Sequence, residues 1–411
     1  MLLMEFLKVD SVETAREKLY SYARESVLLE KLPLEELQGR VLAEDIYADE
    51  DIPSFRRSTV DGYAVVSGDT AAAGESIPVF LTLKGCVEMG RPANLSIAAG
   101  ECAEVATGGM LPDGADAVCM VEYTELFGEK GVALHTSVSN GENVVQAGED
   151  VKARGSVLRR GKRLLPQDIG ALAAAGVTKA PVYAPLRLTV ISTGDELVSP
   201  ELAPEQGQVR DVNTYALAAL AEKDGYAVTG KEVLPDDEQL LEQALLAAMR
   251  TCDVVVVSGG SSKGKKDITR AVIDRVASPG VFTHGMAIKP GKPTILGYDS
   301  DSRTLLAGLP GHPVSAMIVF ETLFGWLYRE LTGTKLSHAI PAMIQCNVAS
   351  SPGRLTCWPA RLEWAETGYI AEPVFGKSGL ITTLTGADGY FTVDRNTEGL
   401  QAGQTVLVHL F

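Results

Sequence analysis

The stretch DVVVVSGGSSKGKKD, residues 253–267, determines the fold class that we expect. Its run of valines predicts a β-strand that is apolar on both faces, as in a parallel sheet covered by helices. Ser258, Gly259, Gly260 and Ser261 follow at the end of this strand. Glycine lets backbone amides approach an anion closely, and serine hydroxyls add hydrogen-bond donors. The stretch lacks GxxxxGK[ST], so it is not a P-loop.

Strands and helices alternate on both sides of this stretch. Apolar runs that predict strands are followed by segments with the apolar spacing of helices. The expected strands are 186–192, 227–234, 253–260, 294–297 and 304–309, and the expected helices are 213–225, 236–250, 267–276 and 314–331. Such alternation indicates a mostly parallel sheet with helices on both faces. We therefore predict a three-layer α/β domain over residues 181–332.

Shorter β-like segments broken by Gly and Pro lie on either side of the α/β domain. Segments such as DGYAVVSGD predict a β-rich domain over residues 51–140, and the tail, residues 333–411, predicts a small β domain. Residues 11–29 and 166–176 have helical spacing. The predicted fold class is α/β multidomain.

The composition limits the classes of ligand. The chain has 411 residues, more than one hydrophobic core usually organises, and 45% of them are hydrophobic. Its formal net charge of −16 argues against a nucleic-acid partner, because phosphate backbones are bound by clustered Lys and Arg. An anionic small molecule would need a locally basic pocket.

Neither the cysteines nor the N-terminus indicates export. The six cysteines are scattered without a CxxC pair, and the first residues contain no basic leader or cleavage site. No stretch approaches the roughly 20 apolar residues that span a bilayer. We expect a cytoplasmic protein with reduced thiols and no membrane partner.

The segment AIKPGKP, residues 287–293, is a second candidate anion site. Pro-Gly suits the centre of a type II turn, which would place the Cα atoms of Lys289 and Lys292 within about 7 Å of each other. Solvated surface lysines are the plain alternative. Because the turn follows the predicted strand GMAI beside the glycine loops, we predict a clamp for phosphate or another oxyanion.

The segment LPGHPVSA, residues 309–316, opens the last long helix of the α/β domain. Pro313 suits the first helical position, which would direct the positive end of the helix dipole to the same sheet edge. His312 is a candidate ligand contact or general acid, although a histidine at a helix start is more often a cap or a packing residue.

Four carboxylates follow strand ends in the α/β domain. Glu196 lies in the loop STGDEL, Asp236 and Asp237 follow the next strand, and Asp267 opens a helix. Mg²⁺ characteristically uses one or two carboxylates together with substrate phosphates. We favour metal or substrate roles for Glu196 and Asp267, whereas helix capping explains at least one of Asp236 and Asp237.

The motifs together resemble the molybdopterin molybdenumtransferase family, MoeA in bacteria and the E domain of gephyrin in animals. The resemblance covers essentially the whole chain. The matching segments are VDGYAV (60–65), ATGGMLPDGADAV (106–118), AGEDV (147–151), STGDEL (192–197), LPDD (234–237), SGGSSKGKKD (258–267), AIKPGKP (287–293), LPGHPVSA (309–316) and SPGR (351–354).

The resemblance implies an Mg²⁺-assisted transferase of molybdenum cofactor biosynthesis. Such an enzyme inserts molybdate into adenylylated molybdopterin and releases AMP. The resemblance also implies a homodimer whose cleft combines the α/β domain of one subunit with the β-rich domain of the other. Four domains are implied: a linker domain (1–50 with 141–180), the β-rich domain, a MogA-like α/β domain and a C-terminal small β-barrel. Molybdopterin adenylyltransferase and apo-molybdoenzymes are further candidate partners.

Motif position assigns roles to individual residues. The expected catalytic residues are Asp61, Glu196 and Asp267, and the expected metal ligands are Asp267, Glu196 and Asp237, with Asp236 as the alternative to Asp237. The expected substrate-binding residues are Thr107, Asp150, Ser258, Gly259, Gly260, Ser261, Lys289, Lys292, Pro310, Pro313, Arg354 and Ser378. The family commonly has Asn where this chain has His312.

Two other functions remain open from the sequence. A molybdopterin adenylyltransferase uses a similar α/β domain and ATP, but standalone versions resemble only that domain. A non-catalytic scaffold is the other, although it would leave the acids and lysines unexplained. The sequence does not distinguish molybdate from tungstate, because the two oxyanions are nearly identical in size and charge.

Overall fold

The computed structural model describes residues 9–259, 266–334, 339–366 and 368–411, without the side chains of Lys266 and Asp267. The chain divides into two compact units. The first contains Met1–Lys31, Gly161–Arg163 and Pro181–Phe411, and the second contains Leu32–Arg160 and Leu164–Ala180. The four domain boundaries expected from the sequence are finer than this division and stay predictions.

A six-stranded sheet in the order β16-β13-β17-β21-β20-β18 forms the α/β part of the first unit. Its strands are β13 (Arg187–Thr193), β16 (Ala227–Leu234), β17 (Val254–Gly259), β18 (Pro279–His284), β20 (Ile295–Asp299) and β21 (Thr304–Leu309). Strands β16, β13, β17 and β21 are parallel, whereas β20 and β18 run antiparallel to their neighbours. The predicted mostly parallel sheet is confirmed.

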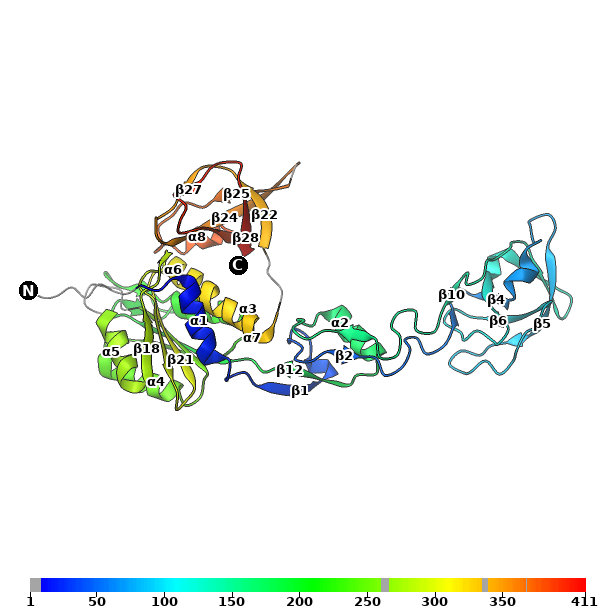
Figure 1. The fold of residues 1–411 in the computed structure, drawn as a ribbon, viewed down its shortest axis with the longest axis horizontal. Coiled ribbons are helices and arrows are strands. Elements are labelled where there is room, and N and C mark those ends of the chain that lie inside the picture. Colours follow the sequence, from blue (N-terminus) through cyan, green and yellow to red (C-terminus); the bar gives the residue numbers. More distant parts are fainter. Residues whose placement is uncertain (1–8, 260–265, 335–338, 367) are drawn as a thin grey trace, which may run out of the picture. The chain divides into compact units, whose positions relative to one another are not determined.

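Helices cover both faces of this sheet (Figure 1). They are α1 (Val12–Ala23), α3 (Asn213–Asp224), α4 (Glu238–Ala248), α5 (Lys266–Val276), α6 (Pro313–Phe320) and α7 (Trp326–Thr332), with the π-helical turn η4 (Glu321–Gly325) between α6 and α7. Figure 1 shows α4 and α5 on one side of the sheet and α1, α3 and α7 on the other. On the α4–α5 side, Leu245 and Ile273 pack against Val255, Val257 and Leu306 in one buried cluster. This is the predicted three-layer arrangement.

The C-terminal part of the first unit is a small barrel. The sheet order is β19-β24-β25-β22-β28-β26, and an additional β24–β26 pairing closes the barrel. Its elements are β19 (Ile288–Lys289), β22 (Ala339–Ile344), β23 (Val348–Ala349), β24 (Leu355–Ala365), β25 (Gly368–Pro373), α8 (Thr382–Thr385), β26 (Gly389–Val393), β27 (Gly399–Leu400) and β28 (Thr405–Leu410). The predicted C-terminal β-barrel is confirmed.

The lysine turn belongs to a different sheet from the one that the sequence suggested. Strand β18 ends at His284, and Gly285, with φ 94°, redirects the chain out of the α/β sheet. The next two-residue strand, β19, pairs with β24 of the barrel sheet instead. The sequence could not reveal this pairing, because β19 has only two residues and is too short to show the alternation of apolar and polar side chains that marks a strand.

A second six-stranded sheet, in the order β7-β4-β6-β5-β9-β8, forms the core of the second unit. Its strands are β4 (Gly62–Val65), β5 (Val79–Cys86), β6 (Glu101–Val105), β7 (Ala117–Met120), β8 (Thr124–Phe127) and β9 (Gly131–Leu134). The smaller elements are β1 (Leu29–Pro33), β2 (Ile46–Tyr47), β3 (Arg57–Ser58), β10 (Val144–Val145), β11 (Ser156–Leu158), α2 (Pro166–Ala174) and β12 (Lys179–Tyr183). This confirms the predicted β-rich region.

One element of the fold differs from the sequence prediction in its extent. Helix α1 ends at Ala23, and Leu29, which the sequence placed in the same helix, begins β1. All six cysteines are free. Within the described residues, no helix combines the length and apolar character that a bilayer-spanning helix requires.

A buried pair of carboxyl groups lies where α3 packs against η4. A Cβ atom at Gly325 would lie 2.7 Å from Asp224 Oδ2 and 2.9 Å from Glu321 Oε1, so both carboxyls pack over this glycine. Arg329 Nη1 donates to Glu321 Oε1 at 2.9 Å. Burial and the neighbouring Glu321 raise the pKa of Asp224 to about 7. The pair is therefore stable when it holds a proton.

We predict that stability falls as this proton is lost. The pKa of an unfolded aspartate is near ~3.9, so the stabilisation by protonated Asp224 is complete below that pH. It disappears as the pH rises through the folded pKa of about 7. Asp224→Asn should abolish this decline, as measured by urea unfolding midpoints across the pH range. Asp301→Asn, on an exposed turn, should keep the wild-type profile. An unchanged profile in Asp224→Asn would contradict the assignment.

Candidate functional site

The register of the parallel strands places their carboxyl ends at one level. Thr193 at the end of β13 pairs with Gly259 of β17 and with Leu234 of β16, and Ser258 pairs with Leu309 of β21. From β13 the chain crosses through α3 to β16 on one side, whereas β17 leads through α5 towards the other side. Such a reversal between adjacent strands creates the crevice in which α/β proteins bind ligands.

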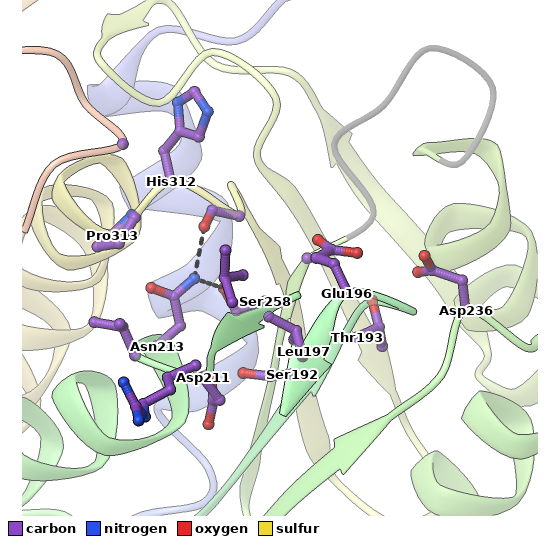
Figure 2. A pocket seen from close by; sticks show the side chains of 16 residues that line it. Ser192, Thr193, Glu196, Leu197, Asp211, Asn213, Asp236, Ser258, His312 and Pro313 are labelled. Carbon is purple, nitrogen blue, oxygen red and sulfur yellow. Dashed lines mark hydrogen bonds between the residues drawn. The ribbon is translucent and has the colours of Figure 1, made fainter. Parts of the chain in front are cut away.

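A cavity of about 420 Å³ lies in this crevice, within the usual range of small-molecule sites. Residues from strand ends, helix starts and one barrel loop line it. They are Ser192, Thr193, Glu196, Leu197, Val209, Arg210, Asp211, Val212, Asn213, Asp236, Ser258, Gly259, Gly311, His312, Pro313 and Gly379. Figure 2 shows Glu196 and Asp236 on one side of this cavity and His312 and Pro313 on the other.

The side chain of Asn213 joins the start of α3 to the ends of two strands around the cavity (Figure 2). Its Nδ2 donates to Ser258 Oγ and to the carbonyl oxygen of Gly311, both at 2.8 Å. Asn213 begins α3, Ser258 lies in β17, and Gly311 follows β21. Ser258 is 1% exposed and Asn213 is 9% exposed, so these bonds are shielded from water. Buried amides are costly when unpaired, so the contacts fix the loops relative to one another.

Gly259 permits the close approach of β17 to β13. Its φ is 136°, and a Cβ atom there would lie 2.1 Å from the carbonyl oxygen of Thr193. No side chain fits this position. The glycine therefore lets the backbones of β17 and β13 approach closely beside the cavity, and the anion contact expected for its amide stays a prediction.

Two helices begin at the cavity. Pro313 is the first residue of α6, as predicted, and Asn213 is the first residue of α3. Helix starts carry partial positive charge and backbone N–H groups without helical partners. Both features favour a negatively charged ligand in the space between them.

The paired acids after β16 have different roles. Asp237 is the N-cap of α4, and its Oδ1 accepts from the backbone N–H groups of Gln239 and Leu240. Asp236 lines the cavity, and its backbone N–H donates to Asp195 Oδ1 at 3.0 Å. The capping role expected for one of the two acids therefore falls to Asp237.

The carboxylates at the cavity do not form a complete protein cage for a metal. Glu196 and Asp236 both line the cavity. Over the described part of the chain, no group of three or more His, Cys, Asp and Glu side chains is placed to hold a metal ion. The metal roles expected for Glu196 and Asp267 therefore stay predictions.

Three of the expected site residues lie at or shortly before the start of α5. Gly260 and Ser261 lie outside the described residues. Asp267 is the second residue of α5, which begins at Lys266, but its side chain is not described.

The expected cationic residues lie in the first unit but do not line the cavity. Neither Lys289, Lys292 nor Arg354 is among the residues that line the cavity. Lys289 ends β19 and pairs with Thr356 of β24, two residues after Arg354. Pro290 and Gly291 form the turn between the lysines, with φ 122° at Gly291. The β19–β24 pairing thus places Arg354 beside the start of β19, and a shared anion site of Arg354 with the two lysines stays a prediction.

The expected residues of the second unit form one close pair. Asp61 Oδ1 accepts from the backbone N–H of Thr107 at 2.7 Å and from its hydroxyl at 2.9 Å. These two hydrogen bonds lower the pKa of Asp61. Asp150 is exposed, and its backbone N–H donates to the carbonyl oxygen of Ile52. The pair and Asp150 belong to a different unit from the cavity.

Sequence reasoning missed Asp211, Asn213 and Arg210 as cavity residues. An asparagine at a helix start usually signals a cap, and Asn213 was therefore read only as the beginning of a helix. Arg210 follows the irregular segment 199–208, and its Nε donates to the carbonyl oxygens of Pro200 and Leu202 in that segment. Only the position of this segment, shortly after STGDEL, could have indicated that Arg210 lines the site.

The fold and the cavity define a multidomain α/β protein with a candidate anion site at the carboxyl edge of its central sheet. Three family descriptions match consecutive parts of the chain. They are the MoeA N-terminal region (domain I and II) at residues 10–176, a probable molybdopterin binding domain at residues 189–329, and the MoeA C-terminal region (domain IV) at residues 341–411.

Relatives match over nearly the full length. A Haemophilus influenzae protein named molybdopterin molybdenumtransferase is 32% identical over 98% of both chains. A Bacillus subtilis protein of the same name is 30% identical over 93% of this chain and 89% of its own. The crystal structure of a molybdopterin biosynthesis MoeA protein from Pyrococcus horikoshii OT3 has a TM-score of 0.81, with 31% identity, and covers 98% of this chain and 100% of that chain.

The chain belongs to the molybdopterin molybdenumtransferase (MoeA) family, which confirms the resemblance seen in the sequence.

The close approach at Gly259 gives a direct test of the cavity floor. Gly259→Ala should destabilise the protein by more than ~2 kcal/mol, because the methyl group would collide with the Thr193 carbonyl and the backbone is left-handed. Gly207→Ala is the matched control, since Gly207 has φ 97° but no atom within 4 Å of an added Cβ. The control should cost only the backbone strain, ~1 kcal/mol. Equal unfolding midpoints for the two variants would contradict the steric argument.

Proposed function

We propose that the protein is a transferase of molybdenum cofactor biosynthesis that inserts molybdate into adenylylated molybdopterin and releases AMP. The observation that carries the proposal is the cavity at the carboxyl edge of the sheet, lined by Ser258 and Gly259 at the end of β17 and by the starts of α3 and α6. Family membership supplies the substrate class.

The cavity lining suits the phosphate part of this substrate. The hydroxyls of Ser192, Thr193 and Ser258 lie at the strand ends, and Gly259 leaves its backbone open. Cleaving a phosphoanhydride requires stabilisation of negative charge more than covalent assistance. In this proposal backbone amides, hydroxyls and helix starts supply that stabilisation, and the leaving AMP stays bound by the same groups.

Cationic residues outside the cavity would bind the negatively charged groups of the substrates that the cavity does not hold. Lys289 ends β19 and Arg354 directly precedes β24, the strand that pairs with β19, whereas Lys292 follows the turn after β19. Ser378 lies next to Gly379, which lines the cavity. Ammonium and guanidinium groups bind tetrahedral oxyanions through charge-assisted hydrogen bonds. We assign these four residues to the molybdate and to the phosphate of the pterin.

Mg²⁺ is proposed to accompany the substrate. Glu196 and Asp236 present carboxylates at the cavity, and Asp267 at the start of α5 would be a third. When bound, the ion would neutralise charge on the phosphate oxygens. The protein residues would orient the substrate and hold the ion, and Asp236 replaces Asp237 in this role because Asp237 caps α4.

We further propose a cytoplasmic homodimer in which the second unit completes the site. Asp61 and Thr107, which share two hydrogen bonds, would contact the substrate held by the α/β domain of the partner. A closed twofold dimer allows such an arrangement because each subunit both gives and receives the same contact.

The adenylyltransferase reaction of the preceding step is not favoured. Family matches extend over the N-terminal and C-terminal regions as well as the α/β domain, and the relatives that match over nearly the full chain are named for molybdenum transfer. ATP-dependent adenylylation of molybdopterin by the purified protein would restore that alternative.

The two acids after β16 provide a matched pair of variants. Asp236→Asn should lower the rate of AMP release from adenylylated molybdopterin, in the presence of Mg²⁺ and molybdate, by roughly a hundredfold. Asp237→Asn should stay near the wild-type rate, because asparagine caps helices as well as aspartate does. Asp267→Asn should resemble Asp236→Asn. A slow Asp237→Asn variant beside an Asp236→Asn variant with the wild-type rate would contradict the assignment of Asp236 to the metal and of Asp237 to the helix cap. A wild-type protein that releases no AMP would refute the function.

Mixing two inactive variants tests the shared site. If the β-rich domain acts on the partner's cavity, a dimer of one Asp61→Asn subunit and one Asp236→Asn subunit contains one site with neither substitution. Co-expression of differently tagged variants, followed by purification of the mixed dimer, should therefore restore AMP release. If each site is formed within one subunit, every site carries one substitution and the mixed dimer stays inactive.

A further inference from the structure

The start of α6 is capped by a distant segment rather than by its own side chains. His312 is the N-cap residue, and its side chain makes no capping hydrogen bond. The backbone N–H of Val314 instead donates to the carbonyl oxygen of Ser378 at 3.2 Å. Ser378 lies in the segment 374–381, which connects β25 to α8 in the barrel and which we call the barrel loop. One helical N–H without a partner in the helix is thus satisfied by the barrel.

His312 makes a second bond to the same residue. Its Nδ1 lies 2.8 Å from Ser378 Oγ. Ser378 is therefore held through its backbone by Val314 and through its hydroxyl by His312. Two bonds to one residue fix its position and its side-chain rotamer together.

The base of the barrel loop is held by the barrel itself: the backbone N–H of Val374 donates to the Pro359 carbonyl oxygen at 2.8 Å, and Phe375 packs edge-on against Trp358. A Cβ atom at Gly376 would lie 2.2 Å from Thr383 Oγ1, so the base of the loop folds closely onto α8. The backbone N–H of Leu380 donates to the Lys377 carbonyl oxygen at 2.9 Å. Lys377 itself is exposed.

The contact with His312 turns the tip of this loop into a cavity wall. Gly379, next to Ser378, lines the cavity together with His312. A Cβ atom at Gly379 would lie 3.8 Å from His312 Cδ2 and 3.9 Å from Nε2, so the imidazole ring and the loop backbone are neighbours. Figure 2 shows His312 beside Pro313 at the rim opposite Glu196 and Asp236.

We propose that His312 is a positioning residue, which holds Ser378 and the barrel loop against α6 so that the barrel forms one wall of the substrate cavity. This inference rests on the proposed function, because it assigns the cavity to the adenylylated pterin. The imidazole acts through Ser378 and takes no part in the chemical step.

Kinetics should separate positioning from catalysis. His312→Ala should raise the KM for adenylylated molybdopterin about tenfold, which corresponds to the loss of one hydrogen bond of ~1.4 kcal/mol, and should leave kcat within about twofold. His312→Asn places a polar atom where Nδ1 stood and should restore most of the affinity. His312→Gln, whose polar atoms lie farther out, should not. A fall in kcat with an unchanged KM would overturn the proposal.

A double-variant cycle tests whether His312 acts through Ser378. In a Ser378→Ala background, adding His312→Ala should change KM by less than about twofold, because the contact is already absent. Effects that multiply would show that the two side chains act independently and would overturn the proposal. His135→Ala, a histidine substitution in the second unit, is the control and should match the wild type.

Hydrogen exchange tests the contact without any turnover. The backbone amides of residues 374–381 and of Val314 should exchange about tenfold faster in His312→Ala than in the wild type, with His312→Asn between them. Unchanged exchange would overturn the positioning role, whatever the activity. A wild-type protein that releases no AMP would refute the proposed function, whereas faster exchange in His312→Ala would still support the contact that holds the loop.

Discussion

The side-chain amide of Asn213 is the interaction on which the site depends. Its two donated hydrogen bonds, to Ser258 Oγ and to the Gly311 carbonyl, join the start of α3 to the ends of β17 and β21. The register of parallel strands fixes only where the loops that follow them begin. The positions of the loops themselves depend on further contacts. Because an unpaired buried amide would cost about 1–3 kcal/mol, Asn213 holds the end of β17 at Ser258 and the segment before α6 at a fixed separation.

The electrostatics of the cavity follow from this arrangement. The chain carries a formal net charge of −16, and yet the proposed substrate is an anion. Backbone amides, hydroxyls and helix starts provide positive potential without adding charged side chains. Glu196 and Asp236 lie on the opposite side of the cavity from His312, where a phosphate would be repelled unless a cation lies between. Gly379 of the barrel loop, next to Ser378, lines the cavity beside His312.

Part of this site was predictable because strand ends follow simple rules. The valine run before Ser258 and Gly259, and the strand before Glu196, predicted both the sheet and the edge that carries the cavity. The choice between Asp236 and Asp237 needed the hydrogen bonds, since either residue could cap α4. Contacts between segments far apart in the chain left no local signal. The bonds of Asn213, the pairing of β19 with the barrel and the contact of His312 with Ser378 are of this kind.

The most direct measurement is a crystal structure of the protein with AMP and Mg²⁺ bound. The account predicts AMP in the cavity between α3 and α6, with its phosphate against the backbone at Ser258 and Gly259 and the ion between that phosphate and Glu196 or Asp236. AMP bound at another surface, or an empty cavity at AMP concentrations that saturate the protein in solution, would contradict it.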